Sequence, residues 1–291
     1  MIRNPTERHI KLQDSDLCYF EWEGKRDSTI LLLHATGFHA RCWDQTVNAL
    51  PQSSRVLAVD LRGHGRSSKE GPFGWFDIGK DIVDFVDALD LYDIVVAGHS
   101  MGGHCALYAS GNRVERFKAL VLVDPVILSP EQYSEHAATM AEMGTNEHPI
   151  AHRRNRWESP SVMYESFCKR HPFSLWQPSI LRDYCEFGLL PNTGEYVLAC
   201  PPKIEAQIYM GTGQRDLNGL LSNVTHPTVV MRAKQRTGPR QTMDFASSPT
   251  WPGLADALPN ARDVYLPDLS HFIPMQRPDL VAAEIRSQLK N

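Results

Sequence analysis

The residues with the clearest chemical potential are one serine and one histidine that lie far apart in the chain. Ser100 is the central residue of GHSMG (residues 98–102), which follows an apolar run and precedes the helix-like stretch GGHCALYAS. A strand that turns sharply into a helix exposes such a serine hydroxyl above a sheet. His271 follows the last apolar run, at the edge where the sites of open α/β sheets gather. We expect His271 to act as the general base for Ser100, a pairing that suits acyl transfer.

An acyl-transfer site also needs hydrogen-bond donors for the oxygen that becomes negatively charged. The turn at Ser100 directs the N–H of Met101 and the start of the following helix toward the space above the serine. We expect the second donor of this oxyanion hole in the loop HATGF (residues 34–38), with Thr36 as the first choice. A glycine-containing turn is also a common structural feature, but this one lies one strand–helix unit before the serine turn.

The elements that position these residues follow from an alternation of short apolar runs with longer amphipathic stretches. This pattern is typical of a mostly parallel sheet covered by helices, and two more polar runs at the start predict an antiparallel hairpin at its edge. We therefore expect an α/β fold with an eight-stranded sheet, whose strands are residues 8–13, 17–23, 29–34, 55–60, 93–98, 119–124, 227–233 and 263–266. Helices are expected at residues 42–50, 76–91, 100–112 and 278–289.

A long insertion interrupts this alternation after the strand that ends at Asp124. A crossover of about a hundred residues far exceeds ordinary connections in compact domains. We interpret residues 130–224 as a mostly helical cap and residues 1–129 and 225–291 as the core. The cap helices are expected from the stretches PEQYSEHAATMAEMG and PSVMYESFCKRH.

The cap is rich in aromatic residues, and some of them should line an apolar pocket over Ser100. We assign Phe38 of the core and Trp157 and Trp176 of the cap to substrate binding, although packing inside the cap is the safer assignment for any one aromatic residue. The basic cluster HRRNR (residues 152–156) lies in the same segment, and we interpret it as a solvated helix face.

Composition narrows the class of partner and the compartment. The chain is 42% hydrophobic and 22% charged with a net charge of −4, which argues against a nucleic-acid binder. It begins without a signal sequence or membrane span, so we expect a cytoplasmic protein without membrane contact, and the oligomeric state is open, with a homodimer as one option. Neither a cofactor nor a metal is expected, because the cysteines lack ligand spacing and should be reduced thiols: Cys18, Cys42, Cys105, Cys168, Cys185 and Cys200.

Together, four motifs resemble the α/β-hydrolase superfamily: GHSMGG around Ser100, DLRGHGRS (residues 60–67), the HATGF loop followed by Trp43, and SHFIPMQRPDLV around His271. The resemblance covers both ends of the core and implies the α/β-hydrolase fold with an inserted cap. It says little about substrate, because the fold hosts esterases, lipases, lactonases, C–C bond hydrolases and perhydrolases. We interpret Asp60 and Arg62 of the second motif as structural residues that hold their loop by charge-assisted hydrogen bonds.

The carboxylate that should orient His271 departs from the common pattern of this superfamily. In most relatives the acid follows the seventh strand closely, but here the corresponding position looks like Arg236. We expect Asp124 to replace it, because it ends the sixth strand on the same sheet edge as Ser100, as in a subset of the superfamily. An aspartate before proline is also a common turn residue, and Asp244 is the alternative acid.

The expected function is therefore hydrolysis of a carboxylic ester or lactone of a moderately apolar small molecule, through an acyl-enzyme on Ser100. Two alternatives stay open. The same residues could cleave a carbon–carbon bond in a β-diketone-like substrate, or the fold could serve as a ligand receptor without turnover.

Overall fold

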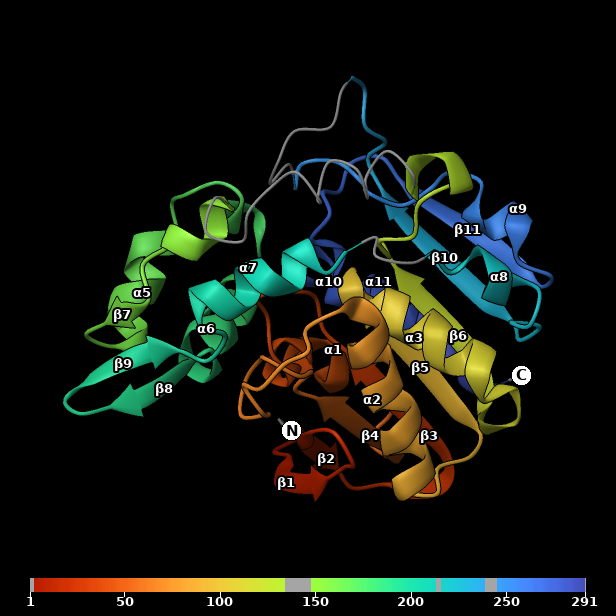
Figure 1. The fold of residues 1–291 in the computed structure, drawn as a ribbon, viewed down its shortest axis with the longest axis horizontal. Coiled ribbons are helices and arrows are strands. Elements are labelled where there is room, and N and C mark those ends of the chain that lie inside the picture. Colours follow the sequence, from red (N-terminus) through yellow and green to blue (C-terminus); the bar gives the residue numbers. More distant parts are fainter. Residues whose placement is uncertain (1–2, 134–147, 213–215, 239–244, 291) are drawn as a thin grey trace.

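The computed structural model describes residues 3–133, 148–212, 216–238 and 245–290. Its centre is an eight-stranded sheet in the order β1-β2-β4-β3-β5-β6-β10-β11 (Figure 1). Only β2 runs against the others, because it pairs antiparallel with both neighbours. The predicted α/β fold and edge hairpin are confirmed; the strands are β1 Thr6–Lys11, β2 Asp16–Trp22, β3 Lys25–Leu33, β4 Ser54–Val59, β5 Ile94–His99, β6 Phe117–Val123, β10 Thr228–Ala233 and β11 Ala261–Leu266.

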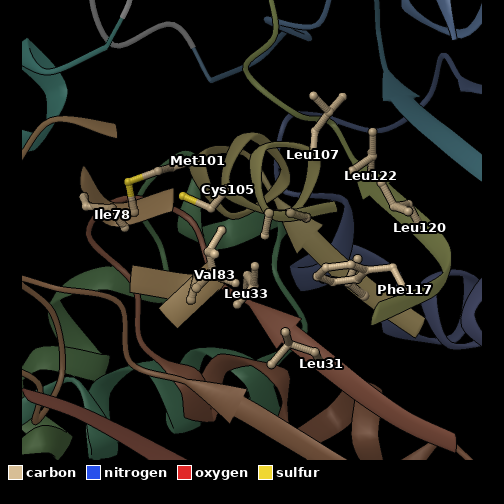
Figure 2. Close-up of a cluster of buried hydrophobic side chains, with 14 of the residues drawn as sticks. Leu31, Leu33, Ile78, Val83, Met101, Cys105, Leu107, Phe117, Leu120 and Leu122 are labelled. Carbon is tan, nitrogen blue, oxygen red and sulfur yellow. The ribbon is translucent and has the colours of Figure 1, made fainter. Parts of the chain in front are cut away.

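The central strands are buried on both faces, which explains their almost continuous apolar sequences. In β3, Leu31 and Leu33 enter one hydrophobic cluster, while Ile30 and Leu32 enter another on the opposite face. The first cluster lies under helices α2 (Trp75–Ala88) and α3 (Met101–Asn112), as Figure 2 shows. The second lies under α1 (Asp44–Asn48) and α11 (Pro278–Leu289). Helices therefore cover both faces of the sheet, so a site that reaches solvent must lie at the ends of the strands.

Helix α2 illustrates how the sequence specifies this packing. Its buried residues Ile78, Ile82, Phe85 and Val86 follow a spacing of four, three and one, which places them on one helical face. Complete burial of each such side chain stabilises the fold by about 1.5–3 kcal/mol. The remaining short helices of the core are η1 Ala40–Trp43, η2 Val114–Arg116, α8 Asn218–Leu221, α9 Leu254–Ala257 and α10 Ile273–Gln276.

The inserted segment contains more than the helices that its sequence predicts. The structure adds a three-stranded antiparallel sheet in the order β7-β9-β8. Thr193 and Gly194 join β8 to β9, and both have positive φ angles, of 40° and 84°. A two-residue loop with two positive φ angles matches the twist of an antiparallel hairpin. The segment's elements are η4 Pro149–His152, β7 Arg156–Trp157, α5 Pro160–Phe167, η5 Phe173–Leu175, α6 Pro178–Phe187, β8 Leu189–Asn192, β9 Glu195–Leu198 and α7 Pro202–Met210.

The helix expected at 160–171 corresponds to α5, whereas most of the stretch at 130–144, like Asp244, lies outside the described residues. Figure 1 shows α5, α6 and the small sheet beside the core, with α7 leading back toward it. Leu217 and Leu221, which precede the expected boundary at 224, pack in the core cluster beneath α3. The end of the inserted segment is therefore part of the core packing.

The basic cluster at 152–156 does not form a solvated helix face, so this interpretation was wrong. Arg154 and Arg156 are exposed, but Arg153 is largely buried against Glu205 of α7. The acidic partner lies far along the chain, where no local pattern identifies it. Within the described ranges, no helix combines the length and the apolar composition needed to cross a lipid bilayer.

Candidate active site

Ser100 lies at the sharp turn between β5 and α3, with φ of 56° and ψ of −117°. A residue other than glycine rarely adopts this backbone conformation, so the surrounding structure must impose it. Two glycines make the turn possible. A Cβ atom on Gly98 would lie 2.2 Å from the Gly102 oxygen, and one on Gly102 would lie 2.2 Å from the Leu33 oxygen. The G-x-S-x-G spacing thus has a direct steric cause, and it holds the Ser100 hydroxyl above the end of the sheet.

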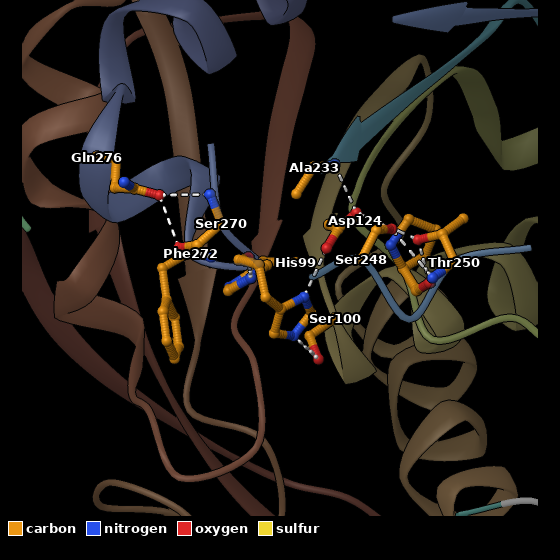
Figure 3. Close-up of polar contacts among 11 residues, drawn as sticks. His99, Ser100, Asp124, Ala233, Ser248, Thr250, Ser270, Phe272 and Gln276 are labelled. Atoms are coloured by element: carbon orange, nitrogen blue, oxygen red, sulfur yellow. Dashed lines mark hydrogen bonds and ion pairs between the residues drawn. The ribbon is translucent and has the colours of Figure 1, made fainter. Parts of the chain in front are cut away.

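A continuous chain of hydrogen bonds joins Ser100, His271 and Asp124 (Figure 3). His271 Nε2 lies 3.0 Å from Ser100 Oγ, and His271 Nδ1 lies 2.7 Å from Asp124 Oδ2. Because a carboxylate oxygen accepts, Nδ1 carries the proton and Nε2 is free to accept from the serine. The residue types and the distances are those needed to turn a hydroxyl into a nucleophile.

Asp124 is fully buried, and its second carboxylate oxygen is surrounded by donors. Oδ1 accepts hydrogen bonds from the Ala233 N–H at 2.9 Å and from Ser248 Oγ at 2.5 Å, while Thr250 Oγ1 lies 3.4 Å away and donates to the Pro125 carbonyl at 2.7 Å. Figure 3 shows these groups gathered on the side of Asp124 that faces away from Ser100. The loop after β10 therefore supplies a hydroxyl group that holds the carboxylate of Asp124, the residue after β6. No spacing signal in the sequence links Ser248 or Thr250 to Asp124.

The loop that holds His271 is fixed from two sides. His99 Nε2 donates to the His271 carbonyl oxygen at 2.8 Å, and Ser270 donates through both N–H and Oγ to Gln276 Oε1. Burial, with a smaller effect of His271, lowers the pKa of His99 well below its ordinary value, so this ring stays neutral. No local pattern in the sequence links His99 to the backbone of His271, which lies 172 residues further along the chain.

Two backbone donors of the loop after β3 have acceptors within the protein. The Gly37 N–H donates to His64 Nε2 at 2.9 Å, and the Phe38 N–H donates to the Ala35 carbonyl at 3.1 Å. In the described part of the chain, Thr36 keeps its N–H outside these bonds, and its hydroxyl lies 3.3 Å from Met101 Sδ. The first N–H groups of α3 have no partner within their helix. The structure thus brings together the two residues expected to form the oxyanion hole.

The motif DLRGHGRS supports this loop as a structural element, as expected. Asp60 accepts from the Ala40 and Arg66 N–H groups at 2.7 and 2.8 Å. Arg62 forms a buried ion pair with Asp81 of α2, at 2.5 Å. His64, to which no role was assigned from the sequence, links this motif to the Gly37 amide.

Aromatic side chains from three segments meet beside the histidine loop. The Phe38 ring lies 5.5 Å from Trp176, 5.4 Å from Tyr184 and 6.0 Å from Phe272, measured between centroids. Phe38 and Trp176, the two residues assigned to substrate binding from the sequence, thus pack against each other in one buried cluster. Trp157 differs from them, because its ring packs 5.4 Å from Phe167 inside the inserted segment.

Among the described residues, one group brings potential metal ligands together, and it lies on the edge hairpin β1–β2. Ligand atoms of Glu7, His9 and Cys18 lie within 4.8 Å of one another. Burial, helped by Asp60, raises the pKa of the Cys18 thiol, so this sulfur holds its proton and is a poor ligand.

A buried histidine in α3 should make the folded protein less stable at acid pH. His104 of α3 packs against the rings of Trp75 and Phe76, and burial lowers its pKa to about 4. An unfolded histidine titrates near 6.5, so the unfolded chain binds more protons below that pH. The free energy of unfolding should fall as pH drops from about 6.5 toward 4. At pH 5 the lowered pKa of His104 reduces the free energy of unfolding by about 2 kcal/mol.

Between pH 7 and pH 5, the free energy of unfolding should fall by about 2 kcal/mol less in His104→Met than in the native protein. Urea unfolding at both pH values measures the difference. Equal losses in the two proteins would show that His104 does not contribute to acid sensitivity.

Comparisons with known proteins agree with this arrangement. A model of the alpha/beta hydrolase family matches residues 30–284. The dihydrolipoyllysine-residue acetyltransferase component of the acetoin cleaving system of Pseudomonas putida is 34% identical over 42% of this chain, which corresponds to 33% of its own length. The sn-1-specific diacylglycerol lipase of Danio rerio is 24% identical over 90% of this chain and 79% of its own length.

Among solved structures, E-2-(acetamidomethylene)succinate hydrolase is similar in fold. Its TM-score is 0.79 at 18% identity, and the match covers 99% of this chain and 100% of that one. At this identity the likeness concerns the fold alone. Because the family model spans nearly the whole core and includes both Ser100 and His271, this chain belongs to the alpha/beta hydrolase family.

Proposed function

We propose that this protein is a serine hydrolase that cleaves a carboxylic ester or lactone of a moderately apolar small molecule. The observation that supports this most strongly is the hydrogen-bonded chain Ser100–His271–Asp124, with distances of 3.0 and 2.7 Å. Membership of a hydrolase family adds to it.

In the proposed first step, Ser100 Oγ attacks the substrate carbonyl carbon while His271 Nε2 takes the serine proton. The N–H groups of Thr36 and Met101 stabilise the negative oxygen of the tetrahedral intermediate. When this intermediate collapses, His271 returns the proton to the departing alkoxide, and an acyl-enzyme remains on Ser100.

In the second step, His271 removes a proton from water, and the resulting nucleophile attacks the acyl carbonyl. Collapse of this intermediate releases the acid and returns the proton to Ser100. Asp124 holds Nδ1 of His271 and stabilises the imidazolium that forms in both steps. Ser248 and the Ala233 N–H keep its carboxylate in the orientation this requires.

The proposed substrate class rests on the aromatic residues next to His271. Phe38, Trp176 and Phe272 belong to one buried cluster, and the Phe272 ring lies 5.8 Å from His271, so apolar acyl or alcohol groups would suit this neighbourhood. The lipase relative, whose name assigns it an ester substrate, is compatible with this class. A cytoplasmic location and a homodimer remain predictions of the sequence.

The test is hydrolysis of p-nitrophenyl acetate, butyrate and octanoate and of an aryl lactone, together with covalent labelling by a fluorophosphonate. We expect labelling, ester turnover and preference for the longer or aryl substrates. Turnover of a β-diketone with cleavage of a C–C bond, in the absence of ester turnover, would replace the proposal with the C–C hydrolase alternative. Absence of both labelling and turnover would overturn it and favour a ligand receptor.

A further inference from the structure

A buried ion pair of the inserted segment lies against the loop after β3, and the proposed mechanism does not use it. Arg153 Nη1 lies 2.9 Å from Glu205 Oε2 and 3.2 Å from Oε1, while Arg153 Nη2 donates to Tyr184 Oη at 3.2 Å. The Arg153 and Glu205 side chains are only 20% and 3% exposed. Three separate elements of the inserted segment therefore meet at this pair.

Burial of two charges costs free energy that their attraction rarely repays in full, and apolar residues of similar size often stabilise a fold as well or better. Burial raises the pKa of Glu205 above its ordinary value, and Arg153 opposes this effect. Stability alone therefore gives a weak reason for placing charges here. A stronger reason is that the pair lies next to the loop after β3.

Glu205 occupies the space next to Gly37. A Cβ atom on Gly37 would lie 2.3 Å from Glu205 Oε1, and Gly37 has a φ of 80° that favours glycine. On its other side, the Gly37 N–H is held by His64. Gly37 is thus fixed between a core histidine and a carboxylate of the inserted segment.

The same contact extends along the loop. His39 Nε2 donates to the Tyr184 carbonyl oxygen at 3.1 Å, and the two rings stack with centroids 5.8 Å apart. Phe38, His39, Arg153 and Tyr184 also line a small cavity of about 10 Å³, which leaves room for about one water molecule. The interface between this loop and the inserted segment is therefore tightly packed and polar at its centre.

We propose that Arg153 and Glu205 are positioning residues that fix the direction of the Thr36 N–H by holding Gly37, its neighbour in the chain. This inference rests on the proposed function, since it assigns Thr36 to the oxyanion hole. It couples the docking of the inserted segment to the stabilisation of the transition state. Because a displacement of about 1 Å at a reacting centre can lower the rate about a hundredfold, a small shift of this loop has a large effect.

The test is a double variant, Arg153→Met with Glu205→Leu, which removes both charges and leaves neither one unpaired. We expect kcat for a p-nitrophenyl ester to fall about 10- to 100-fold, while KM changes less than about twofold. The affinity for an aryl trifluoromethyl ketone, whose adduct with the serine places an oxyanion in the same hole, should fall in parallel with kcat. A purely structural role would lower the melting temperature without this selective loss.

The matched control is Arg156→Met with Glu195→Leu, which removes an exposed ion pair between β7 and β9 of the same segment. We expect this variant to keep native kcat, KM and ketone affinity. Arg153→Lys, which retains a positive charge opposite Glu205, should recover part of the lost kcat. Native kcat and ketone affinity in the double Arg153–Glu205 variant would overturn the proposal.

If the native protein neither labels with a fluorophosphonate nor turns over an ester, the proposed function fails and the positioning role falls with it. If the native protein is active and the double variant is equally active, only the positioning role fails. The two failures are therefore distinguishable.

Discussion

Ser100→Ala is expected to lower kcat for a p-nitrophenyl ester by about 10⁴- to 10⁶-fold and to abolish fluorophosphonate labelling. Without Oγ no acyl-enzyme forms, and only the oxyanion hole and substrate binding remain to accelerate attack by water. KM should change little, because the alanine removes a group that reacts more than it binds. Steady-state kinetics and mass spectrometry of the labelled protein measure both effects.

Ser110→Ala provides the matched control. Ser110 is a buried serine within α3, and its hydroxyl donates to the Leu107 carbonyl of the same helix. This variant should retain labelling and turnover. Persistent labelling of the Ser100→Ala protein would place the nucleophile elsewhere and refute the proposed mechanism.

Asp124→Asn is expected to lower kcat by about 10⁴-fold with KM nearly unchanged. The asparagine keeps the shape of the aspartate but carries no charge. Its amide can present an N–H to His271 Nδ1, which would shift the ring proton to Nε2, where it blocks transfer from Ser100.

Asp279→Asn is a suitable control, because Asp279 is an exposed residue of α11 that pairs with Arg277. It should leave the kinetics unchanged. If Asp124→Asn retains activity and Asp244→Asn loses it, the acid would be the alternative residue and the bond from His271 to Asp124 would be incidental to catalysis.

Much of the fold was predictable because each central strand is buried on both faces and therefore has an almost continuous apolar sequence. The run TILLLH corresponds to the end of β3, and DIVVAG corresponds to β5. The inserted segment was less predictable. Its strands β8 and β9 have four residues each, and their pairing depends on a turn at Thr193 and Gly194 that hydrophobic patterns do not reveal.

The positions of Ser100 and His271 followed from local patterns, since both lie where a strand ends. The contacts that hold them did not. His99 meets the His271 carbonyl and Ser248 meets Asp124 across more than about a hundred residues, which local reasoning from one sequence cannot connect. Local reasoning also could not connect Arg153 with its buried partner Glu205, and for this reason the interpretation of the basic cluster was wrong.

The adjacency of β6 and β10 has a consequence for how the chain folds. Leu120 pairs with Thr228 in the sheet, although the whole inserted segment lies between them. Closing a loop of roughly a hundred residues costs chain entropy before the pairing repays it. On the ribosome, Ser100 and Asp124 are synthesised well before His271, which follows Asp124 by 147 residues. A partly made chain therefore contains the proposed nucleophile without its proposed base, and hydrolytic activity can arise only after β11 and the loop that follows it have been made.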